Sequence, residues 1–272
     1  MSRDFTLKKY TELLQCLAGN GYRFITFGDY CAQKETLADA PFVILRHDVD
    51  LKAANSLATA QIEHAFGLKA SYYFRLVEQS NKPEIIKAIV SMGHEIGYHY
   101  EDMTICEGDV EKAIKHFESQ LSYFRRYYPV KTICMHGAPR SKHDGRDLWK
   151  QFDYHDFGVV GEPYFDVDFS KVFYLTDTGR RWDGFNMSVR DKVPVYQDEW
   201  VRHGLVYHTT DDLVGALHEG RFPKQLMMTT HPQRWTDNKG EWMKEMVIQS
   251  TKNVVKRILV HRGSEKKCIF AH

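Results

Sequence analysis

The order of apolar and amphipathic segments limits the folds open to this chain more than any other feature. From residue 42 to residue 231, short apolar runs of strand length alternate with stretches whose apolar residues recur at helical spacing. Repeated strand–helix units place the strands parallel to one another and the helices outside, in a barrel or a doubly wound sheet. The sequence therefore predicts an α/β fold.

The individual elements follow from the same pattern and from the glycine or proline at their ends. Strands are expected at residues 22–27, 42–46, 68–74, 94–99, 131–136, 205–208 and 225–231, with several short strands between 157 and 184. Helices are expected at residues 6–18, 53–66, 83–93, 110–124, 147–152, 211–218 and 242–260. No linker, low-complexity segment or repeat divides the chain. We predict a single domain, 1–272, with core motifs at 42–231 and the two terminal helices packed on it.

Composition narrows the functional classes. The 37 basic and 36 acidic residues give a net charge of +1, which argues against a nucleic-acid binder that works through a basic field. No apolar run reaches the roughly 18 residues of a membrane-spanning helix, and residues 1–4 lack the apolar core of a signal peptide. Five scattered cysteines without a CxxC pair favour a reduced, cytoplasmic compartment. No pattern indicates an oligomeric state.

Groups that bind metals or transfer protons follow four of the apolar runs. In parallel α/β proteins the carboxyl ends of strands meet at one rim, so these side chains are expected to converge. The residues are Asp48, Asp50, His99, His136 and His231.

The first of these strand ends allows two interpretations. Asp48 and Asp50 share a strand face with Arg46, and two carboxylates on one face repel unless a metal ion or a guanidinium neutralises them. Equally, Asp48 caps the following helix and Asp50 pairs with a surface lysine. At the second strand end, Gly97 would leave space beside His99, whose imidazole suits zinc or serves as a structural group.

Four further residues are candidates for substrate binding. Arg140 is suited to an anion, Trp235 offers a flat apolar face for a sugar, and Glu101 lies just beyond His99. Arg180 belongs to an arginine pair suited to a phosphate or a nucleotide-linked sugar. The alternatives are a solvent-exposed Arg140, a packed Trp235, and pairing of Arg180 or its neighbour with Asp177 or Asp183.

These motifs resemble the polysaccharide deacetylase family, also called the NodB-homology or carbohydrate esterase family 4 group, in a divergent branch. The resemblance covers residues 42–231. It implies a distorted (β/α) barrel that holds a divalent metal, most often zinc, through one aspartate and two histidines. It further implies removal of acetyl groups from N-acetylated sugars.

The family roles carry over to matching positions. Residues 46–50 resemble the first motif, so Asp48 would be the general base and Asp50 a metal ligand, although the family's two aspartates are adjacent. Residues 93–99 resemble the second motif, which makes His99 a ligand. Residues 228–231 resemble a late motif, which makes His231 the general acid.

The second ligand histidine of the family falls on Met103 in this chain. Glu101, Asp102 and His136 are the candidates to replace it, and we take His136 as the third ligand. The third family motif is echoed loosely at residues 136–141. The resemblance implies a metal-dependent deacetylase of surface polysaccharide biosynthesis, acting on an acetylated sugar, a sugar nucleotide or a lipid-linked sugar. The alternatives are an inactive carbohydrate-binding or scaffold protein, and a metal-dependent hydrolase of another C–N bond.

Overall fold

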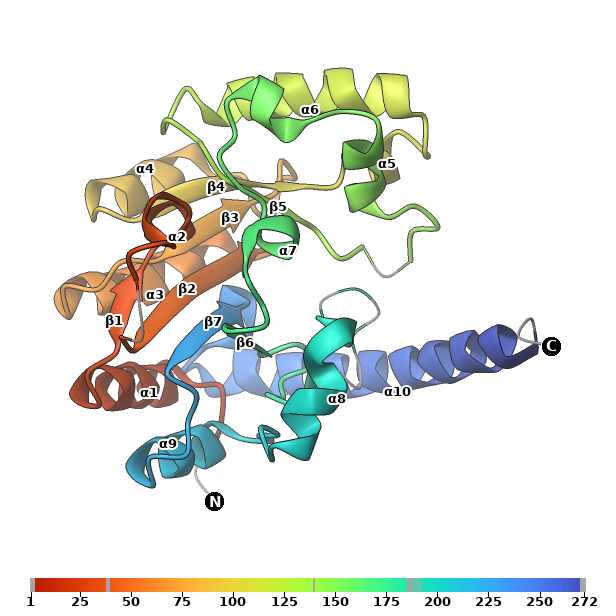
Figure 1. The fold of residues 1–272 in the computed structure, drawn as a ribbon. Helices are drawn as coiled ribbons and strands as arrows, with labels where there is room; N and C mark the ends of the chain where they lie inside the picture. Colours follow the sequence, from red (N-terminus) through yellow and green to blue (C-terminus); the bar gives the residue numbers. More distant parts are fainter. Residues whose placement is uncertain are drawn as a thin grey trace.

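The computed structural model describes residues 3–37, 40–138, 140–184, 188, 190 and 192–269, with side chains as far as residue 254. A curled parallel sheet forms the centre of one mixed α/β domain (Figure 1). Its strands are β1 (Arg23–Ile25), β2 (Phe42–Val49), β3 (Ser71–Phe74), β4 (Glu95–Tyr100), β5 (Ile133–Met135), β6 (Phe173–Thr176) and β7 (Gln225–Thr230).

The strand order is β5-β4-β3-β2-β7-β6, with β1 paired to the first half of β2. Every pair of neighbouring strands is parallel. The α/β class and the curled parallel sheet are confirmed. The barrel is incomplete, because β5 and β6 are the two ends of the strand order and do not pair with each other in the described part of the chain.

Helices surround the sheet. They are α1 (Leu7–Gly19), α2 (Phe27–Gln33), α3 (Ala53–Ala65), α4 (Pro83–Ser91), α5 (Asp102–Ile105), α6 (Val110–Phe124), α7 (Pro163–Asp166), α8 (Pro194–Arg202), α9 (Thr210–His218) and α10 (Lys239–Ile269). Short 3-10 helices lie at η1 (Gly145–Lys150), η2 (Tyr154–Phe157) and η4 (Pro232–Arg234). The expected helices at 6–18, 53–66, 83–93, 110–124 and 211–218 are present, and 242–260 lies within α10. No described helix is long and apolar enough to cross a membrane.

Three predicted strands differ from the structure. The first ends at Ile25, because Thr26 and Asp29 form a capping box that starts α2. Residues 157–184 contain the single named strand β6, together with α7. Residues 205–208 follow α8 and form no strand. Periodicity alone does not distinguish such short apolar runs from packed loops.

Strand β2 is the central strand, and all eight of its residues are buried. It extends past the predicted end at Arg46 as far as Val49, because the polar residues in this half have partners inside the protein. On one face His47 contacts Glu63 of α3 through Nε2, at 2.7 Å, and Thr230 of β7 through Nδ1, at 2.7 Å. This buried network holds α3 and β7 against the strand that carries the candidate site.

Candidate metal centre

A pocket of about 910 Å³ opens at the carboxyl ends of the strands. The residues predicted to converge at this rim all line it: Asp48, Asp50, His99, His136 and His231. They come from β2, β4, β5 and β7 or from the residues immediately after them, so the parallel arrangement of the sheet brings together side chains that are far apart in the sequence.

Asp50, His99 and His136 form a group whose ligand atoms all lie within 4.8 Å of one another. Asp50 Oδ1 is 3.5 Å from His99 Nε2 and 3.5 Å from His136 Nε2. The same oxygen is buried and accepts no hydrogen bond from the described residues. A buried carboxylate oxygen without a donor is costly, and a cation between the three residues would remove that cost.

Hydrogen bonds fix the orientation of both imidazole rings. His99 Nδ1 donates to the carbonyl oxygen of Cys134 at 2.9 Å, and His136 Nδ1 donates to Glu101 Oε2 at 2.9 Å. Because these acceptors require a proton on Nδ1, each neutral ring presents the lone pair of Nε2 toward Asp50. Two imidazole nitrogens and one carboxylate are a donor set that fits zinc or a similar first-row ion.

The charge state of the aspartate also suits a ligand. Burial alone would raise the pKa of Asp50, but the nearby His136, His99 and His231 hold that pKa well below its usual value. The Asp50 side chain is therefore an anion, which is the form that binds a metal. The Nε2 atoms of His99 and His136 each lie 3.5 Å from Asp50 Oδ1, the oxygen that accepts no hydrogen bond from the described residues.

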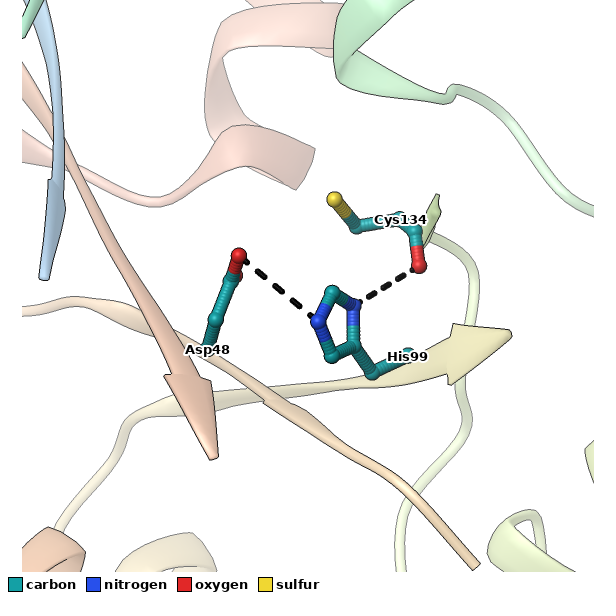
Figure 2. Close-up of side chains that lie close together, drawn as sticks. All are labelled: Asp48, His99 and Cys134. Atoms are coloured by element: carbon teal, nitrogen blue, oxygen red, sulfur yellow. Dashed lines mark hydrogen bonds and ion pairs between the residues drawn. The ribbon is translucent and has the colours of Figure 1, made fainter. Parts of the chain in front are cut away.

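A second group of potential ligands shares His99 with the first. It contains Asp48, His99 and Cys134, all buried (Figure 2). Asp48 Oδ2 lies 3.7 Å from His99 Nε2, but both Asp48 oxygens already accept hydrogen bonds from Arg46. The group around Asp50 has the oxygen without a donor, so it is the better candidate for a metal site.

Asp48 and Arg46 form a bidentate ion pair on the pocket floor. Arg46 Nε and Nη2 donate to the two carboxylate oxygens at 2.8 and 2.6 Å, and both residues are almost fully buried. This is the guanidinium partner that the shared strand face indicated. The guanidinium supplies the opposite charge and the two hydrogen bonds that a buried carboxylate needs.

Gly97 does not leave an open space beside His99, contrary to the prediction. The ring of Tyr73 fills the position, and a Cβ atom on Gly97 would lie 2.3 Å from that ring. The glycine is needed because the Tyr73 ring packs directly against the backbone of β4.

His231 is oriented by an aspartate that the sequence analysis did not assign to the site. Asp177, directly after β6, accepts hydrogen bonds from His231 Nδ1 at 2.7 Å and from the His231 backbone nitrogen at 2.9 Å. Trp235 Nε1 donates to the same carboxylate at 2.8 Å. His231 Nε2 lies 3.9 Å from Asp50 Oδ2. The position of Asp177 at the end of a strand was the available signal.

Glu101 is placed behind His136 instead of in the pocket lining. Arg75 Nε donates to Glu101 Oε1 at 2.8 Å and Arg75 Nη2 donates to Oε2 at 2.9 Å. The carboxylate is therefore shared between Arg75 and His136, and its role is to orient a histidine. The prediction of a substrate contact is corrected on this point.

The other three predicted substrate contacts lie in different surroundings. Trp235 is fully buried against Phe5 and Tyr10, so it offers no face to a sugar. Arg180 lies outside the main pocket, with its guanidinium 4.8 Å from the Trp242 ring. Arg140 is exposed and lines the pocket. Trp235 is therefore a packed side chain, whereas Arg180 lines a second, smaller pocket. Arg181 pairs with Asp183, as the alternative interpretation held.

Met103, at the position of the family's second ligand histidine, is buried in the hydrophobic core. Its thioether therefore packs in α5, and His136 after β5 lies beside Asp50. Comparison with known proteins identifies no relative: no protein-family model, no curated protein and no solved structure matches this chain.

Proposed function

We propose that this protein is a metal-dependent hydrolase that removes the acetyl group from an N-acetylated sugar. The observation that carries the proposal is the buried Asp50 Oδ1, which has no hydrogen-bond donor among the described residues and lies 3.5 Å from the Nε2 atoms of His99 and His136. The resemblance of residues 46–50, 93–99 and 228–231 to deacetylase motifs supports the choice of an acetylated sugar. Surface polysaccharide biosynthesis, in the cytoplasm, is the setting that we propose with it.

Asp50, His99 and His136 would hold the ion. When bound, a divalent ion supplies Lewis-acid activation of the acetyl carbonyl and a lowered pKa for water. Asp48 takes the proton of the attacking water, and its bidentate pair with Arg46 keeps the carboxylate in place.

His231 delivers a proton from Nε2 to the departing amine. Asp177 Oδ1 and Arg234 Nη1 lie 2.7 and 2.8 Å from His231 Nδ1, so that nitrogen is engaged inside the protein and Nε2 is the nitrogen left for transfer. Asp177 is fully buried and His231 nearly so, which keeps the contact between the two side chains away from bulk solvent. Each of the two proton transfers is worth roughly a hundredfold to ten-thousandfold in rate.

Two substitutions separate metal binding from proton transfer. Asp50→Asn should abolish both stoichiometric zinc after dialysis and release of acetate from N-acetylglucosamine oligomers. His231→Gln should retain zinc and lose turnover by at least about a hundredfold. Asp198→Asn, on the exposed part of α8, is the matched control that removes a carboxylate elsewhere and should change neither measurement.

The results can contradict the proposal in two distinct ways. Undiminished zinc in Asp50→Asn would refute the ligand assignment. Stoichiometric zinc in the unchanged protein, without acetate release from any N-acetylated sugar, would refute the deacetylase activity; cyclic amides would then test another C–N bond, and sugar binding without turnover would indicate an inactive carbohydrate-binding protein.

A further inference from the structure

The pocket around the candidate metal centre is lined by more cationic than acidic side chains. The acidic residues are Asp48, Asp50 and Glu245. The cationic residues are Lys52, Arg75, Arg140, Arg190, Arg234 and Lys252. Because a divalent ion would add further positive charge, the pocket favours a ligand that brings negative charge with it.

Several of these charges are already neutralised inside the protein. Arg75 pairs with Glu101, and Arg234 pairs with Asp177. Lys52 Nζ lies 3.5 Å from Glu241 Oε2, and Arg190 Nε lies 3.8 Å from Asp144 Oδ2. The net charge that the pocket presents to a ligand therefore depends on the lining residues that form no such pair.

Arg140 and Lys252 have no ion pair among the described residues, and both side chains are exposed. They come from different parts of the chain, the loop after β5 and helix α10, yet line the same pocket. Of the three acids in the lining, Asp48 is neutralised by Arg46, and Asp50 belongs to the candidate metal centre. Glu245 accepts a hydrogen bond from Gln249 and is the one acid against these two bases that has no ion pair among the described residues. Two cationic side chains therefore remain in the pocket without an ion-pair partner in the part of the chain that the structure describes.

The loop that carries Arg140 is held by a second arginine. Arg190 Nη1 donates to the carbonyl oxygen of Ala138 at 2.7 Å, and Arg190 Nη2 donates to that of Ser141 at 2.8 Å. Ala138 has a φ of +24°, a backbone conformation that is unfavourable for a residue with a side chain. Such a conformation persists where the surrounding structure enforces it, and here the Arg190 hydrogen bonds hold the two carbonyl groups on either side of Arg140.

A buried donor adds to this pattern. Arg234 lines the pocket, and its Nε is buried without a hydrogen-bond acceptor among the described residues. In contrast, Tyr164 is the one tyrosine, phenylalanine or tryptophan among the described lining residues. The pocket therefore has little aromatic surface for stacking and several donors for an anion.

We infer that the substrate carries an anionic group, a phosphate or a carboxylate, which Arg140 and Lys252 bind while its acetyl group faces the metal centre. The placement of the acetyl group at the metal centre rests on the proposed function, whereas the binding of an anionic group does not. A charge-assisted contact of this kind should strengthen binding by roughly tenfold to a hundredfold over the neutral sugar.

The test is calorimetric titration of the zinc-loaded protein with three probes. N-Acetylglucosamine is neutral, N-acetylglucosamine 1-phosphate carries a phosphate, and N-acetylgalactosaminuronic acid carries a carboxylate. At least one charged probe should bind about tenfold or more tightly than the neutral sugar, and added salt should reduce the difference. Which charged probe binds better identifies the anionic group.

Substitutions show whether the named residues are responsible. Arg140→Gln combined with Lys252→Gln should remove most of the preference for the charged probe. Lys142→Gln, an exposed lysine in the same loop that does not line the pocket, is the matched control and should retain it. An anion bound to the metal alone would keep its preference in the double variant, and that result would overturn the inference.

The binding measurement can contradict this inference independently of the proposed function. Equal affinity for the neutral and charged probes would overturn the inference even if acetate is released. Preferential binding of a charged probe without acetate release would support the inference and count against the deacetylase.

Discussion

At the scale of single residues, the candidate centre depends on a carboxylate that is not among the residues lining the pocket, that of Glu101. Glu101 accepts a hydrogen bond from His136 and pairs with Arg75, which also donates from Nη1 to the backbone oxygen of Asp50 at 3.5 Å. This chain of contacts joins the ends of β2, β3, β4 and β5. It explains how His136, after β5, is held beside Asp50.

We predict that Glu101→Ala lowers zinc affinity by roughly ten- to a hundredfold, because His136 loses the acceptor that fixes its tautomer. Glu101→Gln should lose less, since the amide oxygen still accepts the His136 Nδ1 hydrogen bond. Competition with a chromophoric chelator measures both. Glu107→Gln, an exposed glutamate nearby, is the control. Equal affinity in Glu101→Ala and the unchanged protein would show that Glu101 has no positioning role.

Glu162 provides a test of pH dependence away from the ligands. Burial raises its pKa from 4.5 to about 7, although the backbone nitrogens of Met135 and Tyr164 donate to its oxygens. The folded chain therefore holds this proton more tightly than the unfolded chain. The free energy of unfolding is expected to fall by about 3 kcal/mol through this group as pH rises from about 4.5 to about 7.

We predict that Glu162→Gln removes this contribution, so that its unfolding free energy falls less between pH 5 and pH 8 than that of the unchanged protein. Urea unfolding at the two pH values measures the difference. Because other buried carboxyls titrate in both proteins, the comparison between them isolates Glu162. Identical pH slopes would contradict the raised pKa.

At the scale of elements, the sequence predicted what depends on local pattern. Most helices and the core strands follow from periodicity and from their terminal residues, as at Pro83 and in α6. The part of β2 beyond Arg46 was not predicted as strand. A buried strand tolerates these polar side chains because Arg46 and Asp48 form an ion pair in the folded protein, and the local sequence pattern does not reveal that pair. Local pattern also gave no means to tell the loops of residues 157–184 from strands.

Packing at Gly97 supports a prediction about β4, the strand that carries His99. Gly97→Ala should lower the free energy of unfolding by about 1–3 kcal/mol, because the added Cβ would meet the Tyr73 ring at 2.3 Å and the Thr132 carbonyl oxygen at 3.0 Å. Urea unfolding measures the change.

At Gly215 the same substitution is expected to stabilise the protein, and it can be measured alongside Gly97→Ala. It lies inside α9, and a Cβ there would meet nothing within 4 Å. Gly215→Ala should raise the unfolding free energy by about 0.4–1 kcal/mol, since alanine loses less backbone entropy in a helix. A Gly97→Ala protein as stable as Gly215→Ala would show that the Tyr73 ring can move aside.

At the scale of the whole molecule, the sequence predicts that the site residues converge at one end of the sheet, but it does not predict which residues orient them. Parallel strands imply that Asp50, His99, His136 and His231 lie at one end of the sheet, and they do. Asp177 and Arg75 were missed because their roles arise from contacts with residues 54 and 26 positions away. The incomplete barrel likewise depends on which distant strands meet, which periodicity does not specify.

The candidate metal centre joins residues in or directly after β2, β4 and β5, so metal binding should stabilise the whole fold. A ligand that binds only the folded chain, at a hundred times its Kd, adds about 2.7 kcal/mol to the unfolding free energy. For a chain of this size that corresponds to roughly 5 °C in the melting temperature. Zinc should therefore raise the melting temperature of the unchanged protein by about this amount.

The same addition should have almost no effect on Asp50→Asn or His136→Ala, because each variant lacks one of the three ligands. His231→Gln should respond like the unchanged protein, since His231 is assigned to proton transfer and not to the ion. Calorimetric scans with and without zinc distinguish these cases. A full zinc response in His136→Ala would mean that the ion is held by the other group, Asp48, His99 and Cys134, whose ligand atoms do not include His136.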